Sequence, residues 1–209
     1  SGAAGDHHSR FSDLNILCVL SQVTPKELGD AEAVFHWWRD RGHPSPLLLS
    51  EAEFRTSSDC FPIEFRDIMD RHRLLAGRDI VTGLDLDRSF YRAQVEHELR
   101  AKLLRLRQKA GGVLSDKEML RRLLVDSVST FCVLFRHALL LRGVAVEHIK
   151  REVVEKTRLT FGLDPEPFLA LLEVREGRRK AKDVDPLPLF ERYLNQIGIV
   201  VDAVDRMEK

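Results

Sequence analysis

The sequence has few cysteines, no excess of either charge and no long uninterrupted apolar run. Its three cysteines are odd in number, far apart and without metal-site spacing, which argues against a disulfide framework or a zinc site. Lys plus Arg total 33 and Asp plus Glu total 33, so general attraction to nucleic acid or membranes is excluded, although a local basic patch is not. Charged residues interrupt the longest apolar segment, 125–141, and make it a poor membrane span. We therefore expect a cytoplasmic protein without a membrane partner.

What is present suits a globular protein of one large or two small domains. The 209 residues are 44% hydrophobic and 32% charged, enough for a sizeable core. The first dozen residues are polar and glycine-rich and lead directly into an apolar stretch. A loop that opens onto a buried strand suggests that a helix and a strand precede Ser1, or that Ser1 and Gly2 are foreign to the protein.

The segment 13–20 predicts a strand that is polar at its start and apolar afterwards. Alternation places Asp13 and Asn15 on one face of this strand. Two neighbouring oxygen-bearing side chains are suitable ligands for a hard divalent cation. The alternative is that Asp13 caps a turn and Asn15 is a solvated residue at the strand edge.

Strands and helices are predicted to alternate as far as residue 68. Thr24-Pro25 starts a helix with a capping box, which ends at 42–44. A strand is expected at 46–49, and a short helix follows Ser50. The segment 61–68 predicts a third strand, with Ile63 and Phe65 on one face and Glu64 on the other.

From about residue 87 the sequence predicts only helices. They are expected at the ranges 90–108, 115–142, 147–161, 168–174 and 185–207. Short links between helices are typical of a bundle. We predict an α+β protein in which a small mixed-sheet domain, residues 1–84, precedes an all-α helical bundle, residues 85–209.

The N-terminal motifs resemble those of the nucleotidyltransferase superfamily of DNA polymerase beta, in particular the kanamycin and minimal nucleotidyltransferases. The residues that carry the resemblance are the turn Ser1-Gly2 to Gly5, the pair Asp13 and Asn15, and Glu64 in a hydrophobic-acid-hydrophobic context. The glycine that precedes the serine in this family is not in the chain. Asn15 stands where the family has a second acid.

The resemblance implies Mg- or Mn-dependent transfer of a nucleoside monophosphate from a nucleoside triphosphate to a hydroxyl. Asp13 and Glu64 would be the catalytic carboxylates and, with Asn15, the metal ligands. Ser1, Gly2 and Gly5 would hold the phosphates, with Asn15 beside them. Because Asn15 is uncharged, the site is expected to be weakened. The acceptor could be a small molecule, a protein or RNA.

Other interpretations remain open for these residues. Glu64 could pair with Arg66 instead of binding metal, and the chain could be an inactive nucleotide-binding or protein-interaction module, such as a sensor, an antitoxin-like partner or a homodimer. The charged segment 92–102 favours mutual ion pairs over contacts with a substrate. The basic run 178–182 favours a solvated loop over an RNA or phosphate contact.

Overall fold

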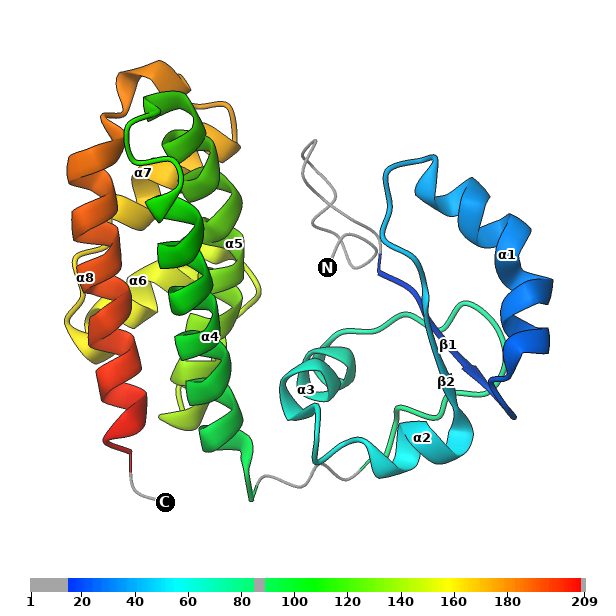
Figure 1. Cartoon of the computed structure of the whole chain (residues 1–209). Coiled ribbons are helices and arrows are strands. Elements are labelled where there is room, and N and C mark those ends of the chain that lie inside the picture. Colours follow the sequence, from blue (N-terminus) through cyan, green and yellow to red (C-terminus); the bar gives the residue numbers. More distant parts are fainter. Residues whose placement is uncertain (1–14, 85–88, 208–209) are drawn as a thin grey trace. The chain divides into compact units, whose positions relative to one another are not determined.

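A computed structural model describes residues 15–84 and 89–207 (Figure 1). The chain divides into two compact units, Ser1–Tyr91 and Arg92–Lys209. The described residues form eight α-helices and a single two-stranded sheet. The expected α+β class with a mixed-sheet domain is therefore wrong, because the described part of the chain is mainly helical and its only sheet is small and parallel.

The N-terminal unit begins with a strand–helix–strand crossover. Strand β1 (Leu17–Leu20) and strand β2 (Leu47–Ser50) are parallel, and α1 (Pro25–Arg39) connects them. Helices α2 (Glu51–Thr56) and α3 (Pro62–Asp70) follow. A parallel pair needs a long connection, which α1 supplies.

The predicted third strand at 61–68 is wrong, because this segment is helix α3. Pro62 occupies the first turn of the helix, where its fixed φ and missing N–H cost nothing. Phe65 is buried and Met69, one turn later, packs against the same cluster, so the segment has a helical apolar face. The alternation of Ile63 and Phe65 covers too few residues to distinguish a strand from a helix.

Helix α1 starts as predicted but is poorly covered. Thr24 and Glu27 form the reciprocal capping box, in which the Glu27 carboxylate accepts from the Thr24 backbone N–H at 2.9 Å. No residue of α1 is buried, and Leu28 is 45% exposed. The expected buried face of this helix is therefore only partly covered within the described residues.

The core of the N-terminal unit is a small cluster around two phenylalanines. Phe54 of α2 and Phe65 of α3 lie with their ring centroids 5.0 Å apart. Leu17 and Val19 of β1 and Leu49 of β2 pack against them. One face of the sheet is thus covered by α2 and α3.

The C-terminal unit is a helical bundle whose extents largely match the predicted helices. Its members are α4 (Tyr91–Gly111), α5 (Lys117–Leu141), α6 (Lys150–Phe161), α7 (Glu166–Arg175) and α8 (Pro186–Asp205). A short 3₁₀ turn, Ala181–Asp183, lies between α7 and α8.

Helix α5 is the centre of the bundle and packs against α6, α7 and α8. Its Phe135 lies 5.2 Å from Phe168 of α7, and its Phe131 lies 5.8 Å from Tyr193 of α8, measured between ring centroids. Burial raises the pKa of Cys132, on the same helix, to about 12. Tyr193 is fully buried and its hydroxyl lies 3.2 Å from Ser127 Oγ, so this polar group has a partner.

The length and apolar character of α5 would allow it to cross a membrane, unlike any other helix among the described residues. However, 56% of its most apolar window is buried inside the protein. Burial in the bundle accounts for this composition, as for the core helix of any soluble bundle.

Candidate functional site

Most of the predicted phosphate- and metal-binding residues lie outside the described part of the chain. Ser1, Gly2, Gly5 and Asp13 all precede residue 15. Asn15 is described, and it is exposed and lies two residues before β1. The site can therefore be examined from Asn15 and from the elements that surround the start of this strand.

Asn15 belongs to the strand face that is covered by α2 and α3. The Leu47 N–H donates to the Ile16 carbonyl at 2.9 Å, so the pairing with β2 reaches back to Ile16. Alternation then places Asn15 on the same face as Leu17 and Val19. Those two side chains pack against the Phe54–Phe65 cluster, so helix α3 lies over the face to which Asn15 belongs.

Glu64 is carried by α3, in its first turn, and not by a strand as predicted. Its side chain is exposed, whereas the next residue, Phe65, is only 3% exposed. At about 100° per residue, Glu64 is about 100° from Phe65 and about 140° from Met69 around the helix, so it points away from the core-facing side of α3. The structure thus brings the helix of Glu64, but not a second strand, onto the face of Asn15.

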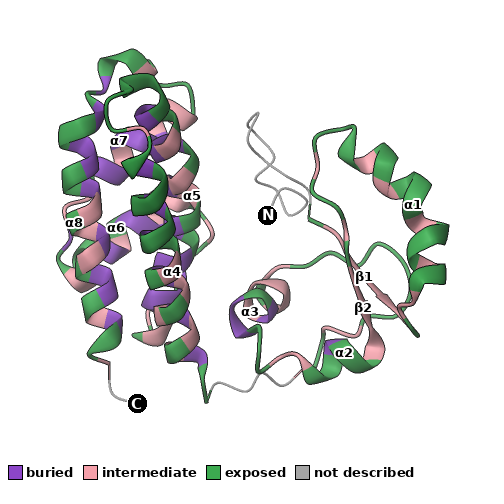
Figure 2. Cartoon of the chain, viewed as in Figure 1, coloured by how far each residue is buried: buried purple, intermediate pink, exposed green. Residues whose placement is uncertain are grey.

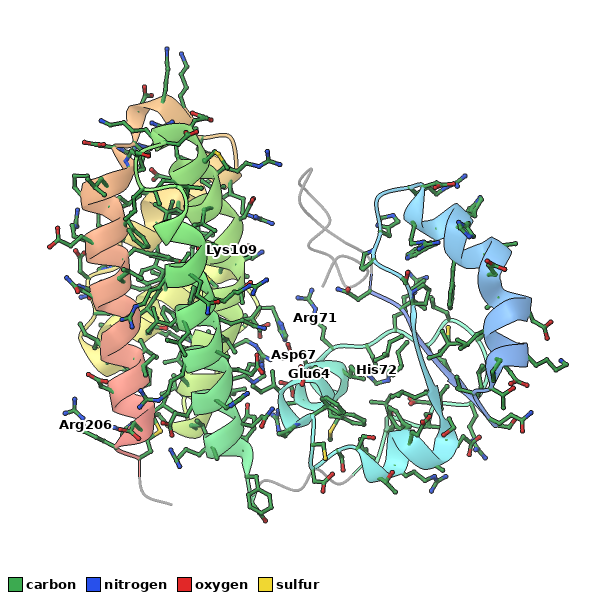
Figure 3. All side chains as sticks on the ribbon, viewed as in Figure 1. Glu64, Asp67, Arg71, His72, Lys109 and Arg206 are labelled. Atoms are coloured by element: carbon green, nitrogen blue, oxygen red, sulfur yellow. The ribbon has the colours of Figure 1, made fainter. Side chains whose placement is uncertain are left out.

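The polar face of α3 contains a second carboxylate. Glu64, Asp67 and Arg71 are three and four residues apart and lie along one side of the helix (Figure 3). Asp67 lies inside the helix, which the predicted strand over 61–68 did not anticipate. Arg66, the alternative partner considered for Glu64, instead pairs with Asp70, with 3.0 Å between its Nε and Oδ1.

A histidine–aspartate pair after α3 was not anticipated from the sequence. His72 Nε2 lies 3.5 Å from Asp79 Oδ2, and its Nδ1 lies 3.1 Å from the Ile68 carbonyl oxygen. Hydrogen bonds from the Thr82 hydroxyl, the Thr82 N–H and the Val81 N–H hold the pKa of Asp79 well below its ordinary value. The spacing Asp-x-x-Thr was the signal that could have revealed this turn. The pair fastens the segment after α3.

Two helix N-termini follow the carboxyl ends of the strands, but each is already occupied by a carboxylate. Glu27 binds the start of α1, and Glu53 binds the start of α2 at 2.7 Å from the Ser50 N–H. These hydrogen bonds lower the pKa of Glu27 to about 2 and lower that of Glu53. Both carboxylates stay ionised, so an anion would be repelled there.

A hollow of about 330 Å³ lies beside α1 and not beside Asn15. Its lining includes Leu28, Phe35, His36, Arg39 and Ser45. Apart from Ser45, which lies in the loop before β2, these residues are apolar and charged side chains of α1, and none of them was predicted to bind a ligand. Neither Asn15 nor Glu64 lines this hollow.

The described residues do not assemble a metal centre by themselves. Asn15 and Glu64 offer the oxygen atoms that Mg prefers. However, no group of three His, Cys, Asp or Glu residues between 15 and 84 or between 89 and 207 could hold an ion. The predicted set of three ligands is thus incomplete without Asp13, and no reaction step through a metal follows from the geometry.

Comparisons with protein-family models, with curated proteins and with solved structures found no match to this chain.

Proposed function

We propose that this chain is a nucleotide-binding protein of the nucleotidyltransferase type, in which transfer to a hydroxyl acceptor is weak or lost. The observation that carries the proposal is the position of Asn15. Asn15 lies just before β1, and the strand face to which alternation assigns it is covered by the helix bearing Glu64. Asn15 and the helix of Glu64 therefore belong to one layer of the N-terminal unit.

Two features of the described residues favour binding over efficient transfer. Asn15 offers a neutral carbonyl oxygen where an acid would bind a cation more strongly. Glu64 is exposed on the flank of α3, so it is not held in the fixed geometry that in-line phosphoryl transfer requires. A triphosphate would still be attracted by a cation held at Asp13, and Ser1, Gly2 and Gly5 would supply backbone N–H groups.

Calorimetric titration of the full chain with ATP and with GTP, in the presence and absence of Mg, tests this proposal. Binding is expected only with the metal, and Asn15→Asp is expected to tighten it by adding a carboxylate. The matched control is Asn195→Asp, the same substitution at an exposed position of α8. Absence of metal-dependent binding in both the wild type and Asn15→Asp would overturn the proposal.

A transfer assay then distinguishes a weak enzyme from an inactive binder. The protein is incubated with labelled ATP or GTP, Mg or Mn, and cell extract, and label is sought on small molecules, proteins and RNA. Label that appears with the wild type, increases with Asn15→Asp and is abolished by Asp13→Asn identifies a weakened transferase. Label on no acceptor, together with metal-dependent binding, identifies a non-catalytic module.

A second candidate, a protein-interaction module, is favoured by one specific observation. Helix α1 buries none of its residues and exposes Leu28, Val34 and Trp37 by about half each, at 45%, 59% and 50%. Val34 and Trp37 are three residues apart and lie on one side of α1, whereas Leu28 lies on another side. Adjacent exposed apolar side chains often mark an interface. Sedimentation of the wild type is expected to show a homodimer that Trp37→Glu dissociates. A wild type that is monomeric at every concentration would exclude this form of the candidate.

A further inference from the structure

Helix α4 has one half in which the cations are paired and another in which they are not. Near its start, Glu96 accepts from Arg92 and from Arg100, each at 2.8 Å. Lys102 pairs with Glu98 at 3.3 Å. These ion pairs confirm the predicted mutual pairing of the segment 92–102. They leave little positive charge uncompensated in the first half of the helix.

The second half of α4 has cations without carboxylate partners. The sequence contains no Asp or Glu between Leu99 and Ser115. Arg105, Arg107 and Lys109 are exposed, and none of them forms an ion pair with the rest of the described chain. Lys109 also lies in the last turn, where a cation interacts favourably with the helix dipole. That effect accounts for one cation but not for three.

The linker between α7 and α8 brings further cations to the same end of the bundle. Lys180 and Lys182 are exposed and have no ion-pair partner among the residues that the structure describes. Lys117, at the start of α5, pairs with Asp185 of the linker at 3.4 Å. Since α5 starts just after α4 ends, the linker lies at the end of the bundle where α4 terminates (Figure 1).

Most acidic groups at this end are engaged elsewhere, except Asp183, which is exposed and directly follows Lys182 in the linker. Asp116 accepts from two backbone N–H groups at the start of α5. Glu118 pairs with Arg121 at 2.5 Å, and Glu176 pairs with Arg151 at 2.8 Å. We call Arg105, Arg107, Lys109, Lys180 and Lys182 the basic end of the bundle. Its charges are left for a partner outside the chain.

We propose that the basic end binds the phosphate backbone of a nucleic acid. Arg and Lys without neighbouring carboxylates are the usual partners of phosphates. Leu103, Leu106 and Ala110 are buried, so the helix that presents three of the cations is fixed by the core. This surface is independent of the nucleotide-binding site proposed for the N-terminal unit.

Two observations favour a phosphate backbone over an acidic protein and over stacked bases. The exposed apolar residues near the basic end, Leu104, Leu114 and Met119, lie on different elements and form no shared anchor for a peptide. No aromatic residue is among the large exposed hydrophobic residues of the described bundle after Phe90. Base stacking is therefore not expected, and a duplex should bind at least as tightly as a single strand.

The test measures fluorescence anisotropy of labelled RNA and DNA, single-stranded and duplex, with the full chain at several salt concentrations. Arg105, Arg107 and Lys109 are all changed to Gln in one variant, because Gln preserves helix propensity. The affinity at low salt is expected to fall roughly tenfold or more, and the slope of log K against log salt to decrease by up to about 3.

A matched control separates the basic end from net charge. Lys26, Arg55 and Arg78, which form exposed ion pairs in the N-terminal unit, are changed to Gln in a second triple variant. Both variants lose the same charge, but only the first is expected to lose affinity. Equal losses, or a wild type that binds neither nucleic acid, would overturn the proposal.

A replacement variant and a competition experiment let the test decide even if the α4 variant does not fold. If the α4 variant does not fold, as judged by circular dichroism, the linker variant Lys180→Gln/Lys182→Gln replaces it, with an expected loss of severalfold. Competition by poly-glutamate that is as effective as competition by duplex would identify an acidic protein as the partner and overturn the nucleic-acid assignment. Titration with ATP reports separately on the nucleotide site, and the α4 variant is expected to leave it unchanged.

Discussion

The two units of the chain differ sharply in how much apolar surface they bury. In the N-terminal unit α1 contains no buried residue, and the core centres on Phe54 and Phe65 (Figure 2). In the bundle, α5 alone buries thirteen residues, and α8 buries a stripe along most of its length. Stability grows with buried apolar area, so the bundle is expected to be the more stable unit. The unit that carries the predicted nucleotide site is thus the one with the thinner core.

The predicted nucleotide site and most of the buried core thus lie in separate regions of the chain. Local opening starts where few apolar contacts must break, and binding segments are commonly drawn from such regions. A ligand that binds only the folded N-terminal unit would stabilise that unit by mass action. The bundle needs no such ligand.

The largest expected effect comes from the bundle core. Phe135 is 0% exposed and lies between Phe131 and Phe168, at 6.3 Å and 5.2 Å between centroids. Phe135→Ala should lower the free energy of unfolding by about 3–5 kcal/mol, through lost burial and a cavity. Urea unfolding followed by circular dichroism measures it. Leu159→Ala, at a position that is 68% exposed, should change it by less than about 0.5 kcal/mol.

A smaller effect is expected from the core of the N-terminal unit. Phe54 is 1% exposed, and Phe54→Ala should cost about 3 kcal/mol, at the lower end of the range for such truncations because a small cluster collapses more easily. Hydrogen exchange should become faster in residues 15–84 and stay unchanged in 92–207. Equal acceleration in both ranges would show that the two units unfold together and that the comparison drawn above is wrong.

The helix caps provide a test of intermediate size. Asp116 accepts from the Glu118 and Met119 N–H groups, both at 3.0 Å. Asp116→Ala should cost about 1 kcal/mol of bundle stability, whereas Asp116→Asn keeps an acceptor and should cost less. Thermal unfolding of the two variants measures the difference. If they are equally destabilised, the hydrogen bonds of Asp116 do not account for its effect.

The smallest effect concerns pH and the start of α1. The capping box lowers the pKa of Glu27 to about 2, with the Thr24 side chain as the main cause. Because the folded pKa is depressed, the contribution of Glu27 is present above its ordinary pKa of about 4.3 and is lost as the pH falls towards 2. Hydrogen exchange in α1 should differ between the wild type and Glu27→Gln at neutral pH. A difference that persists unchanged at pH values near 2 would contradict this.

The sequence predicts the bundle well because local signals and burial agree there. Gly162 ends α6 at φ 75°, in the left-handed region where glycine is favoured, and Pro186 starts α8 where it was expected. The helix predicted over 90–108 buries Val95 and Leu99, which are four residues apart and share one face. Long segments with a clear helical period are compatible with few structures other than a helix.

The N-terminal unit was harder to predict because its segments are short. Around Glu64 the alternation of apolar residues fits a strand over four positions, and the helical period appears only when Met69 is included. The His72–Asp79 contact joins residues on either side of an irregular segment, which periodicity cannot reveal. Asn15 was predicted within a strand over 13–20 but lies two residues before β1, and its proposed role as a ligand stays a prediction.

The three cysteines also differ in accessibility, so their reaction with thiol reagents reports which part of the chain has opened. Cys60 is exposed, Cys18 is intermediate and Cys132 is buried. Thiol reagents should therefore modify Cys60 in the native protein, Cys18 when the N-terminal sheet loosens, and Cys132 only when the bundle comes apart. The order in which the three cysteines of the wild-type protein are modified would show directly which unit unfolds first.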